Sequence, residues 1–173
     1  MSESTNEDFG KIVEKALEAP SYREILDVLN KTREEAVILA EELGKKFSQE
    51  QLASAIKNAI IQLLGRGERG WPKFALELFP FVELDDDIKN AAKKELLRQI
   101  CNPDTGESTI SVFMRWYEIP EDYLQTKQVR HRAKKAIIDL IRSGHDYPAR
   151  QIAFDNLGMT QEEFEKLKLE AKS

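Results

Sequence analysis

Cysteine and histidine are scarce in this sequence of 173 residues, which contains one cysteine, Cys101, and two histidines. One cysteine cannot form a disulfide within the chain, and these three residues cannot supply the four ligands of a structural zinc site. The sequence therefore predicts a protein of a reducing compartment, and we expect a cytoplasmic one. We expect neither a bound metal nor a cofactor.

Long apolar runs are also missing. No stretch of about 18 apolar residues occurs, as a membrane-spanning helix requires. The start lacks the basic segment followed by an apolar one that marks a secretory signal. We therefore expect no membrane partner. Polar and apolar residues nowhere alternate for long enough to predict a β-strand, so the sequence favours an all-α protein.

Helical periodicity is what the sequence does contain, together with four similar helix-start signals. Ser48, Asp85, Pro120 and Thr160 each follow an apolar residue and open a new amphipathic run, at separations of 37, 35 and 40 residues. Two helices of about 12–16 residues and two short turns fill such an interval. The sequence therefore predicts antiparallel helical hairpins stacked as a short α-solenoid-like repeat array. A compact orthogonal helical bundle is the alternative, since four hairpins are too few to distinguish the two.

We expect a single helical domain over residues 1–173, with N-terminal capping helices in residues 1–30 and about four helix-turn-helix repeats in residues 31–171. An apolar stripe between Phe9 and Leu17 predicts the first capping helix. Capping boxes predict further helix starts, because a hydroxyl and the side chain three residues later satisfy early backbone N–H groups. The pairs are Ser21 with Glu24, Thr32 with Glu35, and Ser48 with Gln51.

Glycine and proline predict other boundaries. Gly44 and Gly65 are expected to end helices, and the Trp71-Pro72 and Tyr147-Pro148 pairs to begin them. A third hairpin is expected to comprise helices over residues 107–118 and 121–142.

Three of the predicted second helices end in similar apolar segments. Their periodicity predicts a buried spine formed by Ile60, Leu97 and Ile137. It also predicts that Lys57, Lys94 and Lys134 lie on the solvent side.

Catalytic residues are not evident. Cys101, His131 and His145 are types found in cysteine-nucleophile sites, but Cys101 follows an apolar helix end and is expected to pack as a small hydrophobe. The acidic run of Glu83 and residues 85–87 is explained by helix capping and the helix dipole. We therefore predict that the protein is not an enzyme and has no catalytic site.

Basic residues concentrate in one segment. Residues 127–150 contain seven basic and two acidic side chains, a net charge of +5, whereas the remaining residues carry 19 basic and 29 acidic ones, a net charge of −10. Helical spacing puts four of these side chains on one face: Lys127, Arg130, His131 and Lys134. The same spacing puts an apolar set on the core side: Val129, Ala133, Ile137 and Leu140.

Three further residues are candidate contacts with a partner. Arg66 and Arg69 lie in a glycine-rich loop that lacks the strand and the Gly-Lys-Ser/Thr ending of a phosphate loop. Trp116 and Tyr117 are adjacent, so a helix points them in directions about 100° apart. Core packing is the more common fate of both, and the alternative is that one stays partly exposed to a ligand; Trp116 is the candidate contact.

Together these features predict a non-catalytic helical-repeat binding module, a protein–protein interaction adaptor or regulator with an acidic protein partner. The alternative is a helical repeat that binds RNA or DNA through residues 127–150, because a basic face of this size can neutralise several phosphates. The overall pI of about 5.3 counts against that alternative.

Overall fold

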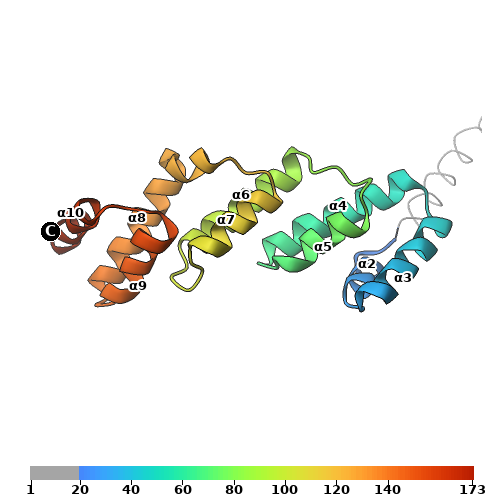
Figure 1. Cartoon of the computed structure of the whole chain (residues 1–173), viewed down its shortest axis with the longest axis horizontal. Coiled ribbons are helices and arrows are strands. Elements are labelled where there is room, and N and C mark those ends of the chain that lie inside the picture. The colour runs from blue at the N-terminus through green and yellow to red at the C-terminus, as the bar shows by residue number, and fades with distance from the viewer. Residues whose placement is uncertain (1–19) are drawn as a thin grey trace, which may run out of the picture. The chain divides into compact units, whose positions relative to one another are not determined.

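The computed structural model describes residues 20–173, and within this range every regular element is a helix and none is a strand (Figure 1). The all-α prediction is confirmed. The chain divides into two compact units, Met1–Ile88 and Lys89–Ser173. The boundary falls in the first turn of helix α6 (Asp86–Ile100). The predicted helix between Phe9 and Leu17 lies outside the described residues, and the single-domain assignment stays a prediction.

The described part of the first unit contains four helices before α6: α2 (Tyr22–Leu29), α3 (Arg33–Lys46), α4 (Gln49–Gly65) and α5 (Gly70–Leu78). Capping boxes open three of them, as predicted from Ser21, Thr32 and Ser48. At Ser48, the backbone N–H donates to Gln51 Oε1 at 2.8 Å, and the N–H of Gln51 donates to Ser48 Oγ at 3.2 Å. Each box satisfies two backbone donors that the first helical turn leaves unpaired.

The core of the first unit forms where α2 packs on α3 and α4, and where α5 packs on α4. Ile60 is fully buried there, as predicted. The predicted helix end at Gly44 is wrong, because α3 continues to Lys46 and ends at the extended residue Phe47. Glycine is tolerated inside a helix, and the lysines at positions 45 and 46 lie in the last turn, where cations favour the helix dipole. Helix α4 does end at Gly65, and the left-handed residue that follows it is Gly67, with φ of 84°.

The second unit contains α6, α7 (Glu107–Trp116), α8 (Lys127–Arg142), α9 (Asp146–Arg150) and α10 (Gln161–Lys172). It also contains two irregular elements, the 3-10 helix η1 (Glu121–Gln125) and the π-helix η2 (Gln151–Asn156). Helix starts next to Asp85 and Thr160 agree with the prediction. The helix expected at Tyr147-Pro148 is only the five-residue α9, which continues directly into η2.

The predicted continuous helix over residues 121–142 is wrong. The 3-10 helix η1 follows Pro120, and Thr126 is extended, with φ of −62° and ψ of 148°. The hydroxyl of Thr126 donates to the Tyr123 carbonyl at 2.8 Å and accepts from the N–H of Val129 at 3.4 Å. The hydroxyl therefore closes the 3-10 turn and caps a new helix, so α8 begins at Lys127.

Polar side chains contribute to the core of the second unit. Asn156 is buried; its amide nitrogen donates to the carbonyls of Ile100 and Asn102, each at 2.9 Å. Its amide oxygen accepts from the N–H of Gly106 at 3.1 Å. One side chain thus ties η2 to the end of α6 and to the residue that precedes α7.

The predicted spine is correct at Ile60 and Ile137, which are fully buried, and wrong at Leu97, which is half-buried. The buried apolar residues of α6 instead include Leu96 and Ile100. Lys94 and Lys134 are exposed as predicted. Lys57 departs from the prediction, because it is half-buried and its ammonium forms ion pairs with Asp85 at 2.5 Å and Asp87 at 2.6 Å.

Candidate functional site

The basic face of α8, defined as Lys127, Arg130, His131 and Lys134, lies on a helix whose other side is firmly packed. Val129, Ala133 and Ile137 are fully buried, as predicted, whereas Leu140 is half-buried. Lys127, His131 and Lys134 are exposed, and Arg130 is half-buried. The four side chains therefore belong to one rigid element of the second unit.

Two members of the basic face lie close to the beginning of α10. The pKa of Glu163 is lowered mainly by the backbone N–H of Thr160, and the charges of Arg130 and Lys134 lower it further. Arg130 also donates to Gln125 Oε1, from Nε at 3.1 Å and from Nη2. Within residues 20–173, the side chains of Lys127 and His131 form no hydrogen bond or ion pair. The side chains of the basic face that remain without a partner within the described residues are therefore Lys127, at the first position of α8, and His131.

The first turn of α8 does not match the helix dipole. It contains no acidic residue and begins with Lys127; α5 likewise lacks an acidic first turn, whereas the first turns of α2, α3, α4, α6, α7 and α10 all contain Asp or Glu. The positive end of the helix dipole favours acidic residues, so Lys127 does not stabilise this helix start. An external anion near this turn would be attracted by both the lysine and the dipole.

Arg66 and Arg69 lie in the first unit, in the loop between α4 and α5. Both are exposed, and the guanidinium of Arg66 lies 5.2 Å from the centre of the Tyr22 ring. Arg69 occupies the residue before α5 and does not cap this helix through its side chain. Because they belong to the first unit, the structure does not join them with the basic face of α8 into one site.

Trp116 and Tyr117 differ in burial. Tyr117 is fully buried and packs on Phe113, with ring centres 4.7 Å apart. Burial raises the pKa of the Tyr117 hydroxyl far above its usual range, and the nearby charge of Glu95 raises it further. Trp116 is half-buried at the end of α7, so part of its indole remains accessible to a partner.

Cys101 is half-buried after the last residue of α6, and burial raises the pKa of its thiol although the charge of Arg132 opposes the shift. A raised pKa keeps the thiol protonated and unreactive. His131 and His145 are both exposed. This environment agrees with the expected packing role of the cysteine.

The acidic run before α6 has a structural role. Asp85 Oδ1 accepts from the N–H groups of Asp87 and Ile88, each at 3.1 Å, and the ammonium of Lys57 lowers the pKa of Asp85. Asp85 therefore caps α6 and links it to α4. Across residues 20–173, no three His, Cys, Asp or Glu side chains form a group suited to holding a metal ion.

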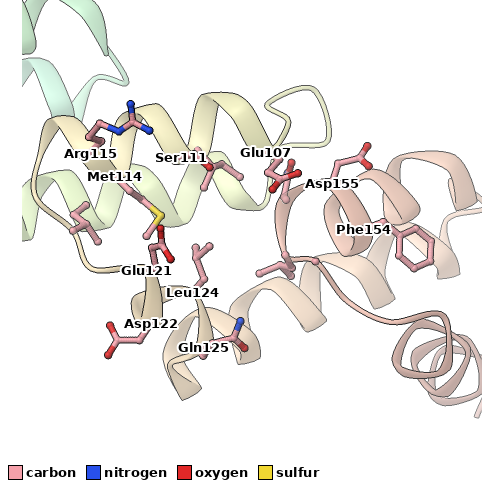
Figure 2. A pocket seen from close by; sticks show the side chains of 15 residues that line it. Glu107, Ser111, Met114, Arg115, Glu121, Asp122, Leu124, Gln125, Phe154 and Asp155 are labelled. Carbon is pink, nitrogen blue, oxygen red and sulfur yellow. The ribbon is translucent and has the colours of Figure 1, made fainter.

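One surface of the second unit is not predicted by any sequence pattern: a groove between α7, η1 and η2 (Figure 2). Its lining includes Glu107, Glu121, Asp122 and Asp155, which are all exposed. Glu107, Glu121 and Asp122 lie in first helical turns, where acidic residues are common, and Asp155 belongs to no sequence motif. No local sequence pattern therefore marks these four carboxylates as part of a binding site. Only the folding of three elements around one groove brings these carboxylates together.

The arrangement defines an all-helical protein with two charged surfaces of opposite sign on its second unit. Comparison with protein families, curated proteins and solved structures found no match to this chain. Among the described helices, none is both long and apolar enough to cross a bilayer.

Proposed function

We infer that the protein is a non-catalytic helical-repeat binding module of a reducing compartment such as the cytoplasm, acting as an interaction adaptor or regulator. In this proposal its hairpins stack as a short α-solenoid-like array, and the basic face of α8 binds an acidic segment of a partner protein. Arg66, Arg69 and Trp116 are additional candidate contacts.

The first turn of α8 is the observation that carries the proposal. Lys127 lies where a helix favours an acidic residue, is exposed, and has no ionic partner among residues 20–173. A carboxylate from a partner would meet this ammonium together with the positive end of the helix dipole. His131 and Lys134 extend the same face along the helix, so a segment with several acidic residues fits better than a single anion.

Helix direction in the second unit supports the stacked-hairpin part of the proposal. Arg130 in the first half of α8 and Lys134 at its middle lie close enough to Glu163, near the start of α10, for their charges to lower its pKa. At the other end of α8, Arg142 Nε donates to the carbonyl of Ala171 at 3.2 Å. The two helices therefore run in the same direction, with α9 and η2 between them in sequence, as second helices of successive stacked hairpins do.

The experiment compares two charge-matched double variants for binding to a fluorescein-labelled peptide of alternating Glu and Asp. Lys127→Gln with Lys134→Gln removes two charges from the basic face. Lys94→Gln with Lys172→Gln removes two exposed charges elsewhere on the second unit. At low salt we expect the first pair to weaken binding by about fivefold or more and the second pair to have little effect. Thermal unfolding followed by circular dichroism checks that both variants fold.

Equal binding by the two double variants would show that α8 presents only a solvated face. A single-stranded RNA of about 20 nucleotides tests the alternative, because each neutralised phosphate releases counterions and affinity falls steeply between about 50 and 200 mM salt. Tight RNA binding with a steep salt dependence that the Lys127 and Lys134 changes reduce would replace the protein partner with nucleic acid.

A further inference from the structure

The groove between α7, η1 and η2 encloses a volume of about 720 Å³. Its floor is apolar and comes from all three elements and the turns beside them. The floor residues are Ile110, Met114, Ile119, Leu124 and Leu157. Four of these are largely buried, and Leu124 is half-buried. Among these floor residues, Leu124 therefore offers most of the apolar surface that an incoming side chain can contact.

The rim of the groove is acidic. Figure 2 shows Glu107 and Asp155 close together toward one end, and Glu121 and Asp122 on η1 toward the other. The lining contains one cation, Arg115, and its guanidinium points away from these carboxylates in the same view. The lining residues therefore carry four negative charges and one positive charge, with the positive one directed elsewhere.

These four carboxylates form no hydrogen bond or ion pair with any other residue in the described part of the chain. Several other carboxylates of the second unit are engaged, although those of Asp104, Asp139 and Glu170 are not engaged within the described residues. Glu95 pairs with Arg98 at 2.9 Å, Glu118 pairs with Lys89 at 2.8 Å, and Glu163 closes a capping box. Like charges gathered around the groove repel one another, although Glu107, Glu121 and Asp122 also lie in first helical turns, which favour acidic residues.

The walls of the groove are held in place by contacts that do not use the rim. The Ile119 N–H donates to the Met114 carbonyl at 2.9 Å and closes the end of α7. The buried Asn156 ties η2 to the residue before α7 through Gly106. The groove is therefore formed before any ligand binds, which lowers the entropic cost of binding.

We propose that this groove binds a basic segment of a partner protein in which apolar residues lie between lysines or arginines. The basic side chains pair with the carboxylates at the two ends, and an apolar side chain contacts the floor beside Leu124. This site is distinct from the basic face of α8, because its ligand carries the opposite charge. Nucleic acid is disfavoured here, since phosphates would approach four carboxylates.

The test uses a fluorescein-labelled peptide with two leucines between two Lys-Arg-Lys triplets, and a second peptide with serines in place of the leucines. Fluorescence anisotropy with the full chain should detect binding of the leucine peptide. The serine peptide should bind about tenfold more weakly, because burying a leucine side chain contributes about 1.5–3 kcal/mol.

Two charge-matched variants locate the site. Glu121→Lys with Asp122→Lys should weaken binding of the leucine peptide by at least about tenfold, through lost pairing and new repulsion. Asp139→Lys with Glu170→Lys changes two exposed carboxylates outside the groove and should leave the affinity within about twofold. The wild-type comparison of the two peptides tests the apolar floor even if a variant fails to fold.

Four results would overturn the proposal: no binding of the leucine peptide at about 1 mM, equal affinity for both peptides, equal loss in both double variants, or no loss in the Glu121 and Asp122 variant. Sedimentation of the wild-type protein provides a fifth. Dimers that disappear in the Glu121 and Asp122 variant would mean that a second copy of this chain, rather than a basic partner segment, occupies the groove.

Discussion

The two units of this protein differ in charge and in the way their helices are arranged. Residues 1–88 contain 11 basic and 18 acidic side chains, a net charge of −7, whereas residues 89–173 contain 15 and 13, a net charge of +2. In the described part of the first unit, three helices begin with complete capping boxes. The second unit contains one capping box, at α10, and both irregular helical elements.

Buried polar side chains follow the same division. Within residues 20–173, the buried polar set is Glu95, Gln99 and Asn156, and all three belong to the second unit. Glu95 accepts from Arg98 at 2.9 Å and from Gln99 at 3.0 Å, and Asn156 bonds to backbone groups 50 or more residues away. Capping boxes therefore begin most helices in the described part of the first unit, whereas in the second unit, where both candidate binding surfaces lie, the buried Asn156 joins elements 50 or more residues apart.

Alanine substitutions in the apolar core should destabilise both units to a similar extent, and this loss of stability is the largest effect that we expect. Ile60→Ala and Ile137→Ala remove fully buried side chains, so each should lower the free energy of unfolding by about 2–5 kcal/mol in chemical denaturation. Leu97→Ala is the control and should cost less, because Leu97 is half-buried. A larger loss from Leu97→Ala than from Ile137→Ala would contradict the assigned core.

A buried amide of the second unit should contribute more to stability than a helix cap of the first unit, and Asn156→Ala can be compared with Ser48→Ala to test this. Loss of the Asn156 amide leaves two carbonyls and one N–H without their partner, and the buried Ile100 carbonyl alone should cost about 1–3 kcal/mol. Loss of the Ser48 cap should cost about 1 kcal/mol, because water can reach the exposed helix start.

The same denaturation measurement checks this prediction. If Ser48→Ala destabilises the protein as much as Asn156→Ala does, the second unit does not depend on its long-range polar contacts more than the first unit depends on its local caps.

The smallest expected effect concerns the ion pair between Asp85 and Lys57 in the first unit. Hydrogen bonding to Lys57 lowers the pKa of Asp85, so the ionised carboxylate stabilises the fold above its unfolded pKa of about 4. This contribution is lost as the pH falls through the lowered pKa of the folded state. Hydrogen bonding to Asp85 likewise raises the pKa of Lys57, so its contribution is lost at the alkaline end.

Asp85→Asn keeps a side chain that can cap α6 and removes the charge. The wild type should therefore be slightly more stable than this variant at neutral pH, and the difference should vanish in thermal melts at acidic pH. A difference that persists unchanged to the acid limit would mean that Asp85 acts only as a cap.

Regions predicted correctly from the sequence share a short range of interaction. The helix starts at Ser21, Thr32, Ser48 and Thr160 follow from contacts between residues three apart, and such contacts are the same in any fold. The burial of Val129, Ala133 and Ile137 follows from helical periodicity in the same way. The start of α8 after Thr126 also depends on neighbouring residues. However, a threonine without Glu or Gln three residues later predicts a helix start less strongly than a capping box does.

The sequence by itself therefore determined that the chain is helical, where most helices begin, and that α8 has a basic face opposite a core face. Tertiary structure alone decided which side of α6 is buried, how Asn156 is used, that Arg130 and Lys134 lie near α10, and which carboxylates surround one groove. The physical reason is the distance along the sequence between the residues that interact. Caps and periodicity depend on neighbours within one or two helical turns, whereas the groove and the buried polar contacts join residues tens of positions apart, whose proximity no local pattern encodes.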